Sequence, residues 1–214
     1  MAERWVQQRR SDAYWKKAKR EGYRSRAAYK LQQIQARYGV LRRGDRVVDL
    51  GCAPGGWTQA ALEIVGERGA VVGVDLDKVQ KLPPATFVKG DMTKPETLAA
   101  VKVALGGSGA EAVISDMSPN ISGMYSVDQA RSVMLARMAL RTARELLQPG
   151  GTFVAKVFEG EDFAGFLAEV KRSFRFVKVH APPASRKESS EVYVVAKRFK
   201  GAADKARPAR REEE

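Results

Sequence analysis

The sequence has very little cysteine and histidine, with Cys52 as its one cysteine and a single histidine among 214 residues. One cysteine excludes an internal disulfide, and one cysteine with one histidine cannot form a Cys/His zinc cage. Long hydrophobic runs are also missing, and the apolar stretches are far shorter than the roughly 18 residues of a membrane-spanning helix. The opening residues, MAERWVQQRR, lack the apolar core of a secretory signal. We therefore expect a cytoplasmic protein without a membrane segment or a structural metal.

Positive charge, in contrast, is abundant and lies mainly at the two ends of the chain. Residues 1–30 hold ten basic and three acidic side chains, residues 197–214 hold seven and four, and the whole chain carries a net charge of +13. Such ends favour binding to a phosphate backbone, because each neutralised phosphate releases counterions. Aromatic residues are interspersed among the N-terminal basic residues, and they could either stack on RNA bases or hold an N-terminal helix against the body. These are Trp5, Tyr14, Trp15 and Tyr23.

The remaining chain has the composition of one ordinary globular domain. Hydrophobic residues make up 44% of the sequence, and the length suits a single core. We expect a basic N-terminal extension over residues 1–23, a folded domain over 24–199 and a disordered charged tail over 200–214. The small body predicts a monomer.

Short apolar strands alternate with amphipathic helices along the folded part. Helices are predicted over residues 25–38 and 127–147, and the sequence Pro149-Gly150-Gly151 is expected to end the second. This alternation predicts an α/β fold with a seven-stranded, mostly parallel, Rossmann-like sheet covered by helices on both faces. The last two strands lack a helix between them and could form an antiparallel hairpin. The predicted strands are 46–50, 70–75, 86–89, 112–115, 152–158, 174–180 and 192–197.

A glycine-rich turn follows the first predicted strand, in the sequence DLGCAPGGWTQ from Asp49 onward. In open α/β sheets, ligands bind beyond the carboxyl ends of the strands, and glycines there let the backbone come close to them. Ala53 and Pro54 break the G-x-G-x-x-G spacing of dinucleotide sites, and Pro54 also removes an amide donor. The turn therefore favours a nucleoside without phosphates and disfavours a nicotinamide-dependent dehydrogenase.

Acidic side chains recur at the ends of the first four predicted strands. They are Asp49, Asp75, Asp91 and Asp116. An aspartate at the position of Asp75, 24 residues beyond Gly51, commonly accepts hydrogen bonds from ribose hydroxyls. Each aspartate alone could be a turn former or a helix cap, but four at one edge of the sheet indicate a binding site.

Three further charged residues stand out by their positions in the predicted helices and strands. Lys156 interrupts the apolar strand TFVAKVF, which should be central, so it favours a functional lysine. Lys30 lies at the margin of the apolar face of the helix over 25–38. Glu191 opens the last strand, and if that strand is antiparallel, Glu191 joins Asp116 and Lys156 at one edge.

The motifs DLGCAPGGWTQ, SDMSPNISG, AKVFEG and SSEVYVVA, preceded by SRAAYKLQQI, together resemble the FtsJ/RrmJ family of ribose 2′-O-methyltransferases. The resemblance covers most of the chain, from about Arg24 to Lys197. It implies a class I methyltransferase fold that uses S-adenosylmethionine to methylate a uridine ribose in large-subunit ribosomal RNA, either free or in the assembled subunit. The implied catalytic residues are Lys30, Asp116, Lys156 and Glu191, and the implied cofactor contacts are Gly55, Trp57, Asp75, Asp91 and Asp116.

A ribose hydroxyl is a poor nucleophile and needs a base to take its proton. The resemblance and the placement of Lys156 both suggest this lysine as the general base. Neutralising an ordinary lysine at pH 7 costs about 4.6 kcal/mol, so its surroundings must favour the neutral amine. Asp116 and Glu191 favour the charged form, and orientation is therefore their expected role.

Two other functions remain open on the residues alone. A methyltransferase acting on a tRNA anticodon loop would share the same four residues, and an RNA-binding assembly factor without catalysis would share the basic ends. Base methylation is disfavoured, because Cys52 lies inside the glycine-rich turn and the sequence after Asp116 lacks the Pro-Pro-aromatic motif of amine methylation.

Overall fold

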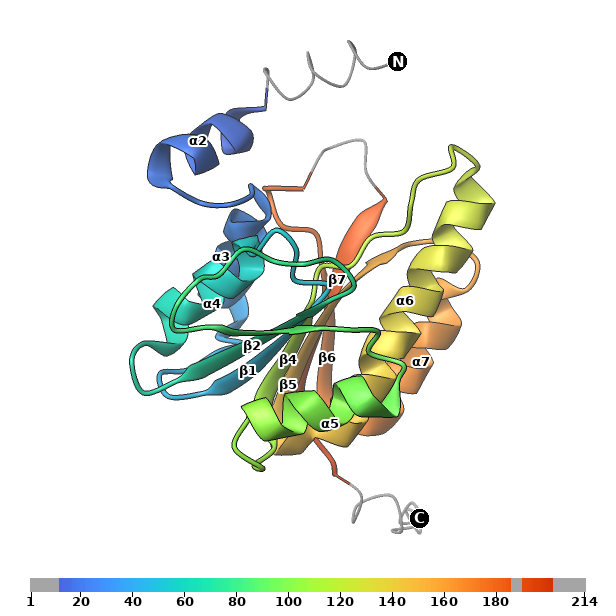
Figure 1. The fold of residues 1–214 in the computed structure, drawn as a ribbon. Coiled ribbons are helices and arrows are strands. Elements are labelled where there is room, and N and C mark those ends of the chain that lie inside the picture. The colour runs from blue at the N-terminus through green and yellow to red at the C-terminus, as the bar shows by residue number, and fades with distance from the viewer. Residues whose placement is uncertain (1–11, 186–189, 202–214) are drawn as a thin grey trace, which may run out of the picture.

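A seven-stranded sheet forms the centre of the protein in a computed structural model that describes residues 12–185 and 190–201 (Figure 1). The strand order is β3-β2-β1-β4-β5-β7-β6, and β7 runs antiparallel to both of its neighbours while the other pairs are parallel. The predicted fold class is therefore confirmed, including its antiparallel final strand. The strands are β1 (Arg46–Leu50), β2 (Ala70–Asp75), β3 (Thr86–Lys89), β4 (Ala110–Ser115), β5 (Leu147–Phe158), β6 (Phe174–His180) and β7 (Glu191–Phe199).

Helices cover both faces of this sheet. Two of them, α3 (Ala27–Tyr38) and α4 (Gly56–Val65), lie on one face. The other face is covered by α5 (Pro95–Ala104), α6 (Tyr125–Leu146) and α7 (Phe163–Ser173) (Figure 1). Within the described part of the chain, no helix is long and apolar enough to cross a membrane.

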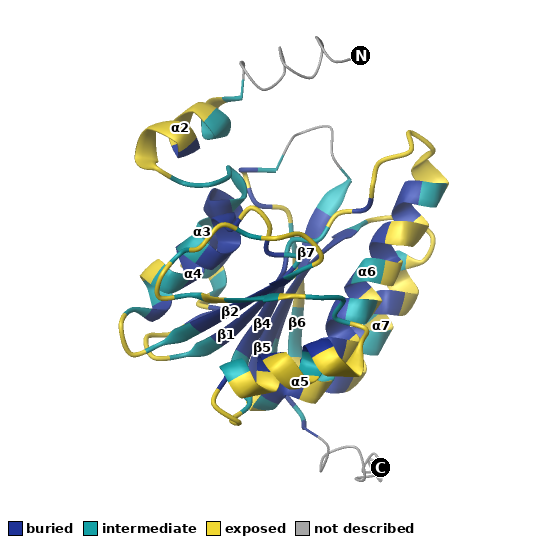
Figure 2. Cartoon of the chain, in the orientation of Figure 1, coloured by how far each residue is buried: buried dark blue, intermediate teal, exposed yellow. Residues whose placement is uncertain are grey.

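The core has two layers because the central strands contribute side chains to both faces. Val47 of β1 packs in the cluster under α3 and α4, whereas the next residue, Val48, packs in the cluster under α5, α6 and α7. This alternation follows from the two-residue period of a strand. Figure 2 accordingly shows the middle of the sheet as buried and the outer helix surfaces as exposed. A sheet covered on both faces leaves its strand ends open to ligands.

Several element boundaries differ by a few residues from those the sequence predicts. The long helix α6 ends at Leu146, before Pro149, because Leu147 already pairs with Ala110 of β4. The register shifts between this pair and the next, Ala112 with Thr152, so the segment 149–151 lies inside β5. β4 and β7 are also longer than predicted, since their ends pair with neighbouring strands.

An additional helix, α2 (Ala13–Glu21), precedes the sheet and its covering helices and packs against them. The ring of Tyr29 lies 5.6 Å from the ring of Tyr14 and 5.4 Å from that of Tyr23, measured between centroids. Of the two roles considered for these tyrosines, the structure therefore favours holding the helix against the body. Trp5 and the tail from residue 202 lie outside the described residues.

Candidate active site

The glycine-rich turn after β1 forms the floor of a pocket of about 410 Å³ at the carboxyl ends of the strands. Gly51 has a φ of +70°, and a Cβ there would lie 2.2 Å from the Cγ atom of Met117. Only glycine fits this position, since both the backbone conformation and the close neighbour exclude a side chain. The pocket is lined by Gly51, Ala53, Asp75, Leu76, Asp77, Gly90, Asp91, Met92, Asp116, Met117, Ser118, Leu135 and Met138.

Three of the predicted acidic residues meet in this pocket: Asp75, Asp91 and Asp116. Asp75 accepts hydrogen bonds from the backbone amides of Ala53 (2.8 Å) and Asp77 (2.9 Å), so it also shapes the turn. Asp91 accepts from the amide and the hydroxyl of Thr93, and these bonds lower the pKa of its carboxyl. Asp91 is therefore both a turn former and a residue of the pocket wall.

The two other predicted cofactor contacts, Gly55 and Trp57, are not among the residues that line the pocket. The side chain of Trp57 is 2% exposed, and its indole N–H donates to the carbonyl of Ala27 at 2.9 Å. Its ring stacks on that of Tyr193 with centroids 5.6 Å apart. The structure therefore does not bring the Trp57 side chain to the pocket.

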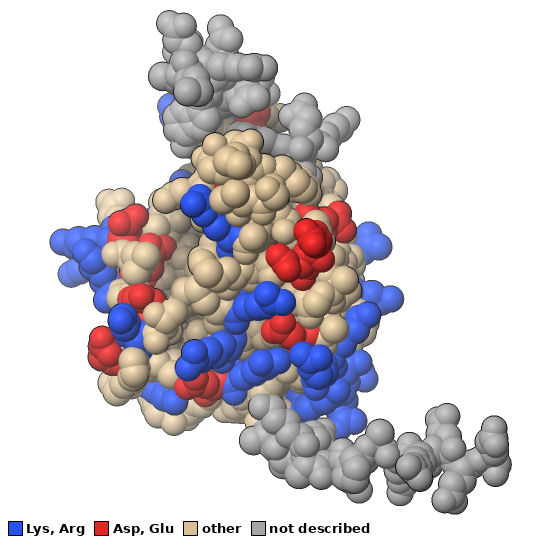
Figure 3. All heavy atoms as spheres, turned by 90° about the vertical axis from the view of Figure 1, so that its right-hand side faces the viewer, with Lys and Arg blue, Asp and Glu red and all other residues tan. Residues whose placement is uncertain are grey.

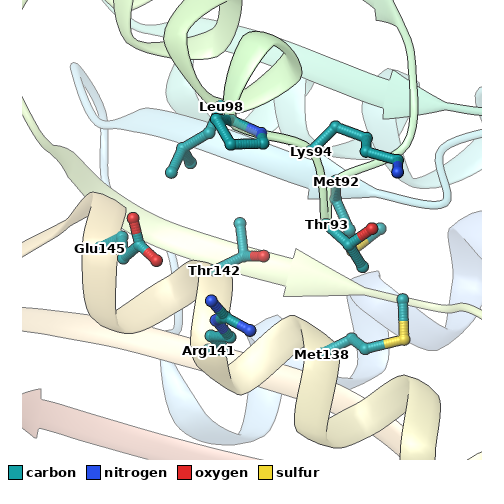
Figure 4. A pocket seen from close by; sticks show the side chains of 9 residues that line it. Met92, Thr93, Lys94, Leu98, Met138, Arg141, Thr142 and Glu145 are labelled. Carbon is teal, nitrogen blue, oxygen red and sulfur yellow. The ribbon is translucent and has the colours of Figure 1, made fainter.

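A second, smaller hollow of about 300 Å³ lies between α5 and α6 and shares Met92 and Met138 with the first. Figure 4 shows its α6 wall, with Arg141 and Glu145, across from Leu98 of α5. None of the aspartates at the strand ends lines this hollow. The pocket over the glycine-rich turn is therefore the better candidate for a nucleoside site.

The four predicted catalytic residues form one cluster beside that pocket. The Nζ atom of Lys156 lies 3.0 Å from Oδ1 of Asp116 and 4.0 Å from Oε2 of Glu191. It also donates to the backbone carbonyl of Asp116 at 2.6 Å. The Nζ atom of Lys30 lies 2.5 Å from Oε1 of Glu191. The cluster draws on α3, β5, β7 and the residue that directly follows β4, and this residue, Asp116, belongs to both the cluster and the pocket.

Strand pairing explains how Glu191 reaches this place. β7 is antiparallel to β5, and Phe158 at the end of β5 pairs with Glu191 at the start of β7. The first residue of β7 thus lies at the same edge of the sheet as the last residues of the parallel strands. This is the arrangement that the sequence predicts for an antiparallel final strand.

Two members of the cluster were not predicted from the sequence, Tyr193 and Ser185. The hydroxyl of Tyr193 donates to Oδ1 of Asp116 at 2.6 Å, and that of Ser185 donates to Oε1 of Glu191 at 2.8 Å. Tyr193 lies two residues after Glu191 and pairs with Lys156 across the strands. The two-residue period of β7 could have pointed to Tyr193, whereas nothing in the local sequence singles out Ser185.

The electrostatics of the cluster keep Asp116 ionised and Tyr193 protonated. Burial alone would raise the pKa of Asp116, but the charges of Lys156 and Lys30, with hydrogen bonds from Tyr193 and Lys156, lower it overall. Burial and the neighbouring Asp116 and Glu191 raise the pKa of Tyr193 well above its usual value. The Tyr193 hydroxyl is therefore a hydrogen-bond donor to the carboxylates, and the cluster pairs two amines with two acids.

The remaining strand-end acid, Asp49, is fully buried beneath the turn and is not among the residues that line the pocket. Its Oδ2 atom accepts from the hydroxyl of Thr58 at 2.6 Å, whereas Oδ1 has no hydrogen-bond partner within the described residues. Burial raises the pKa of Asp49 to about 7, and the charges of Asp116 and Asp75 act in the same direction. Burial likewise raises the pKa of the Cys52 thiol, which disfavours a thiolate nucleophile in this turn.

Asp49 is therefore expected to make the folded protein less stable as the pH rises. Between about pH 4 and pH 7 the folded state keeps a proton on this carboxyl that the unfolded chain has lost, so stability falls across that window. Asp49→Asn should remove this slope. The difference in free energy of unfolding between the variant and the wild type should therefore be more favourable to the variant at pH 8 than at pH 4, by on the order of 2–4 kcal/mol. The measurement is denaturant unfolding at several pH values. Asp77→Asn, at an exposed carboxylate, is the control, and parallel curves for wild type and Asp49→Asn would contradict the prediction.

Comparison with known proteins agrees with this geometry. The family model described as FtsJ-like methyltransferase matches residues 23–199. Ribosomal RNA large subunit methyltransferase E of Methanothrix thermoacetophila is 55% identical over 188 residues, which cover 88% of this chain and 72% of that protein. The protein of the same name from Methanobrevibacter smithii is 46% identical over 202 residues, covering 94% and 96% of the two chains.

Solved structures show the same fold. A crystal structure named as a ribosomal RNA methyltransferase from Plasmodium falciparum is 27% identical, with a TM-score of 0.77 over 84% of this chain and 100% of that chain. Aeropyrum pernix fibrillarin, solved with S-adenosyl-L-methionine, has a TM-score of 0.55 over 81% of this chain and 75% of its own. It is 17% identical, so it supports the fold alone.

Proposed function

Because this chain belongs to the FtsJ-like methyltransferase family, we propose that it transfers the methyl group of S-adenosylmethionine to the ribose 2′-oxygen of a uridine in large-subunit ribosomal RNA. The relatives that share about half of its residues are named for methylation of this RNA. The observation that carries the proposal is the shared position of Asp116, which lines the nucleoside pocket and lies 3.0 Å from Nζ of Lys156. One carboxylate thus joins a donor site to a candidate base.

The residues of the pocket fit the methyl donor. The backbone at Gly51 leaves no room for a side chain, Asp75 offers a carboxylate to ribose hydroxyls, and Leu76, Met92 and Met138 provide apolar surface for a purine ring. S-adenosylmethionine, when bound, supplies an electrophilic methyl group on a sulfonium ion. The protein then has to present the ribose hydroxyl in line with that methyl group and remove the hydroxyl proton.

Lys156 is our candidate for removing the proton. Its amine donates to two oxygens of Asp116. The amine must be neutral before it can accept the proton of the 2′-hydroxyl. For an ordinary lysine, that neutralisation costs about 4.6 kcal/mol at pH 7. Asp116 holds the amine in place through its side-chain and backbone oxygens. Lys30 and Glu191 pair at 2.5 Å, and we assign them the role of orienting the ribose.

The proposal is tested by labelled-methyl transfer to RNA from cells that lack this protein. Free large-subunit rRNA, isolated large subunits and bulk tRNA are compared as acceptors, and the methylated ribose is mapped. We expect one new ribose methyl on a uridine of large-subunit rRNA. Transfer to tRNA alone would point to an anticodon-loop enzyme, and donor binding without transfer to any acceptor would point to an assembly factor.

Asp75 is expected to contribute strongly to donor binding. Asp75→Ala should weaken the affinity for S-adenosylmethionine about 10- to 100-fold, because hydrogen bonds to a charged group contribute roughly 1.5–3 kcal/mol. Isothermal titration calorimetry measures this, with Asp162→Ala, an exposed aspartate at the start of α7, as the control. Unchanged donor affinity would remove Asp75 from the site.

The partner and the location follow from the same proposal. We propose that the protein acts as a monomer on rRNA or on the large subunit, in the cytoplasm and without a membrane. The basic residues of α2, Lys16, Lys17, Lys19 and Arg20, lie exposed at the end of the molecule that carries the site, and they can contact RNA phosphates (Figure 1).

A further inference from the structure

Three exposed apolar side chains lie close together in the chain next to the candidate active site. The solvent-exposed surface around such a site is ordinarily polar. Ile121 is 65% exposed, Met124 is 63% exposed and Tyr125 is 59% exposed. They lie in the loop between β4 and α6 and at the first residue of α6, and we refer to these three side chains as the apolar rim. Figures 1 and 2 show this loop rising, exposed, above the strand ends on the side where β7 begins. Such exposure indicates a binding surface.

The apolar rim is held in a defined shape. Asp128, in the first turn of α6, accepts hydrogen bonds from the amide and hydroxyl of Ser122 and from the amide of Gly123. The hydroxyl of Tyr125 donates to the carbonyl of Glu159 at 2.6 Å. A loop anchored at these points presents its side chains with little loss of entropy on binding.

The same bonds tie the apolar rim to the catalytic cluster. Glu159, which accepts from Tyr125, donates its own amide to the carbonyl of Ser190 at 3.0 Å, and Ser190 directly precedes Glu191. Glu159 also lies three residues beyond Lys156, which corresponds to about 10 Å along a strand. A nucleotide whose ribose lies at Lys156 therefore has the apolar rim within reach of its base or of the neighbouring base.

Charge distinguishes the two sides of this region. Exposed acidic residues, Glu159, Glu161 and Asp162, follow β5 beside the apolar rim. Figure 3 shows acidic side chains grouped high on the face that carries α6 and α7, whereas Lys and Arg gather in the lower half of that face. The basic residues of α2 at the site end, Lys16, Lys17, Lys19 and Arg20, are exposed. The acidic side repels a phosphate backbone and α2 attracts it, which favours contact of the apolar rim with bases.

We propose that the apolar rim is the surface on which the protein holds unstacked RNA bases at the target nucleotide, with the phosphate backbone directed toward α2. Single-stranded bases are recognised by stacking on aromatic and apolar side chains, and Tyr125 and Met124 provide such a platform. The inference rests on the proposed function for its substrate, and it assigns specificity to residues outside the catalytic cluster.

The test compares two double variants that remove similar apolar surface. Met124→Ala with Tyr125→Ala should weaken binding to deproteinised large-subunit rRNA about 10-fold and raise the KM for RNA similarly, with unchanged donor affinity. Met134→Ala with Val103→Ala, at two exposed apolar positions elsewhere on α6 and α5, should leave RNA binding as in the wild type. Tyr125→Phe keeps the ring, loses the bond to Glu159, and should stay within about twofold of the wild type.

The outcomes separate this inference from the proposed function. Equal RNA affinity for the two double variants would overturn the inference while leaving methyl transfer untouched. If the wild-type protein transfers no methyl group but the rim variant binds RNA more weakly, the proposed methyl transfer is wrong and the apolar rim is still an RNA-binding surface. On isolated subunits, a photoreactive side chain at position 124 should crosslink to rRNA, and a crosslink to a ribosomal protein instead would overturn the assignment to bases.

Discussion

Replacing Lys156 with alanine is expected to abolish methyl transfer while the protein still binds S-adenosylmethionine. Lys156 is 6% exposed and contacts Asp116 through both the side-chain and backbone oxygens. General bases contribute roughly 10²- to 10⁴-fold to a rate, so the single-turnover rate should fall by about that factor. Donor affinity should stay within about twofold, because Lys156 is not among the residues that line the donor pocket.

Further variants separate the base from a purely electrostatic or structural role. Lys156→Met keeps an apolar stem of similar length, so it remains informative if the alanine variant does not fold. Lys156→Arg keeps a positive charge that cannot be removed near neutral pH. Both should be as inactive as the alanine variant. Lys197→Ala serves as the control, because Lys197 is a lysine of β7 that contacts the carbonyls of Tyr38 and Gly39, away from the catalytic cluster. Near wild-type turnover of Lys156→Arg would exclude Lys156 as the base.

Removing the charge of Asp116 is expected to have the second largest effect, on both stability and rate. Asp116→Asn takes away the carboxylate that faces Lys156 at 3.0 Å and accepts from the Tyr193 hydroxyl. Breaking a buried ion pair costs about 3–5 kcal/mol, and Glu191 at 4.0 Å from Lys156 should keep the loss near the lower limit. The transfer rate should fall about 100-fold, since the amine loses its orientation.

Single-turnover rates and denaturant unfolding measure the two effects of Asp116→Asn. Glu169→Gln, which removes one partner of an exposed pair with Arg137, is the control and should cost less than about 1 kcal/mol. A transfer rate of Asp116→Asn near that of the wild type would contradict this role for Asp116.

Part of the site was predictable because some residues contradict their local pattern. Lys156 interrupts an apolar strand, Asp75 and Asp116 end strands, and Glu191 begins one, so each is conspicuous in the sequence. Lys30 is different, because its helical position alone is equally compatible with a side chain lying over the core. The family resemblance added the stronger indication, and in the tertiary structure its amine lies 2.5 Å from Glu191.

Other features depend on contacts between distant segments. Trp57 follows the glycine-rich turn directly, yet its indole points into the core because the Ala27 carbonyl and the Tyr193 ring lie there. Ser185 and the apolar rim are near the site only because the folded chain brings distant segments together. Their local sequences carry no periodic signal that could indicate this.

By itself the sequence determined the α/β class, the glycine-rich turn and the edge of the sheet that carries the acids, because these follow from local periodicity and from the direction of parallel strands. The tertiary structure alone decided that β7 lies between β5 and β6, and so placed Tyr193 opposite Lys156. The same packing brought Lys30 onto Glu191 and the apolar rim beside the site. Strand order and side-chain direction are set by long-range packing, for which a single sequence contains no local pattern.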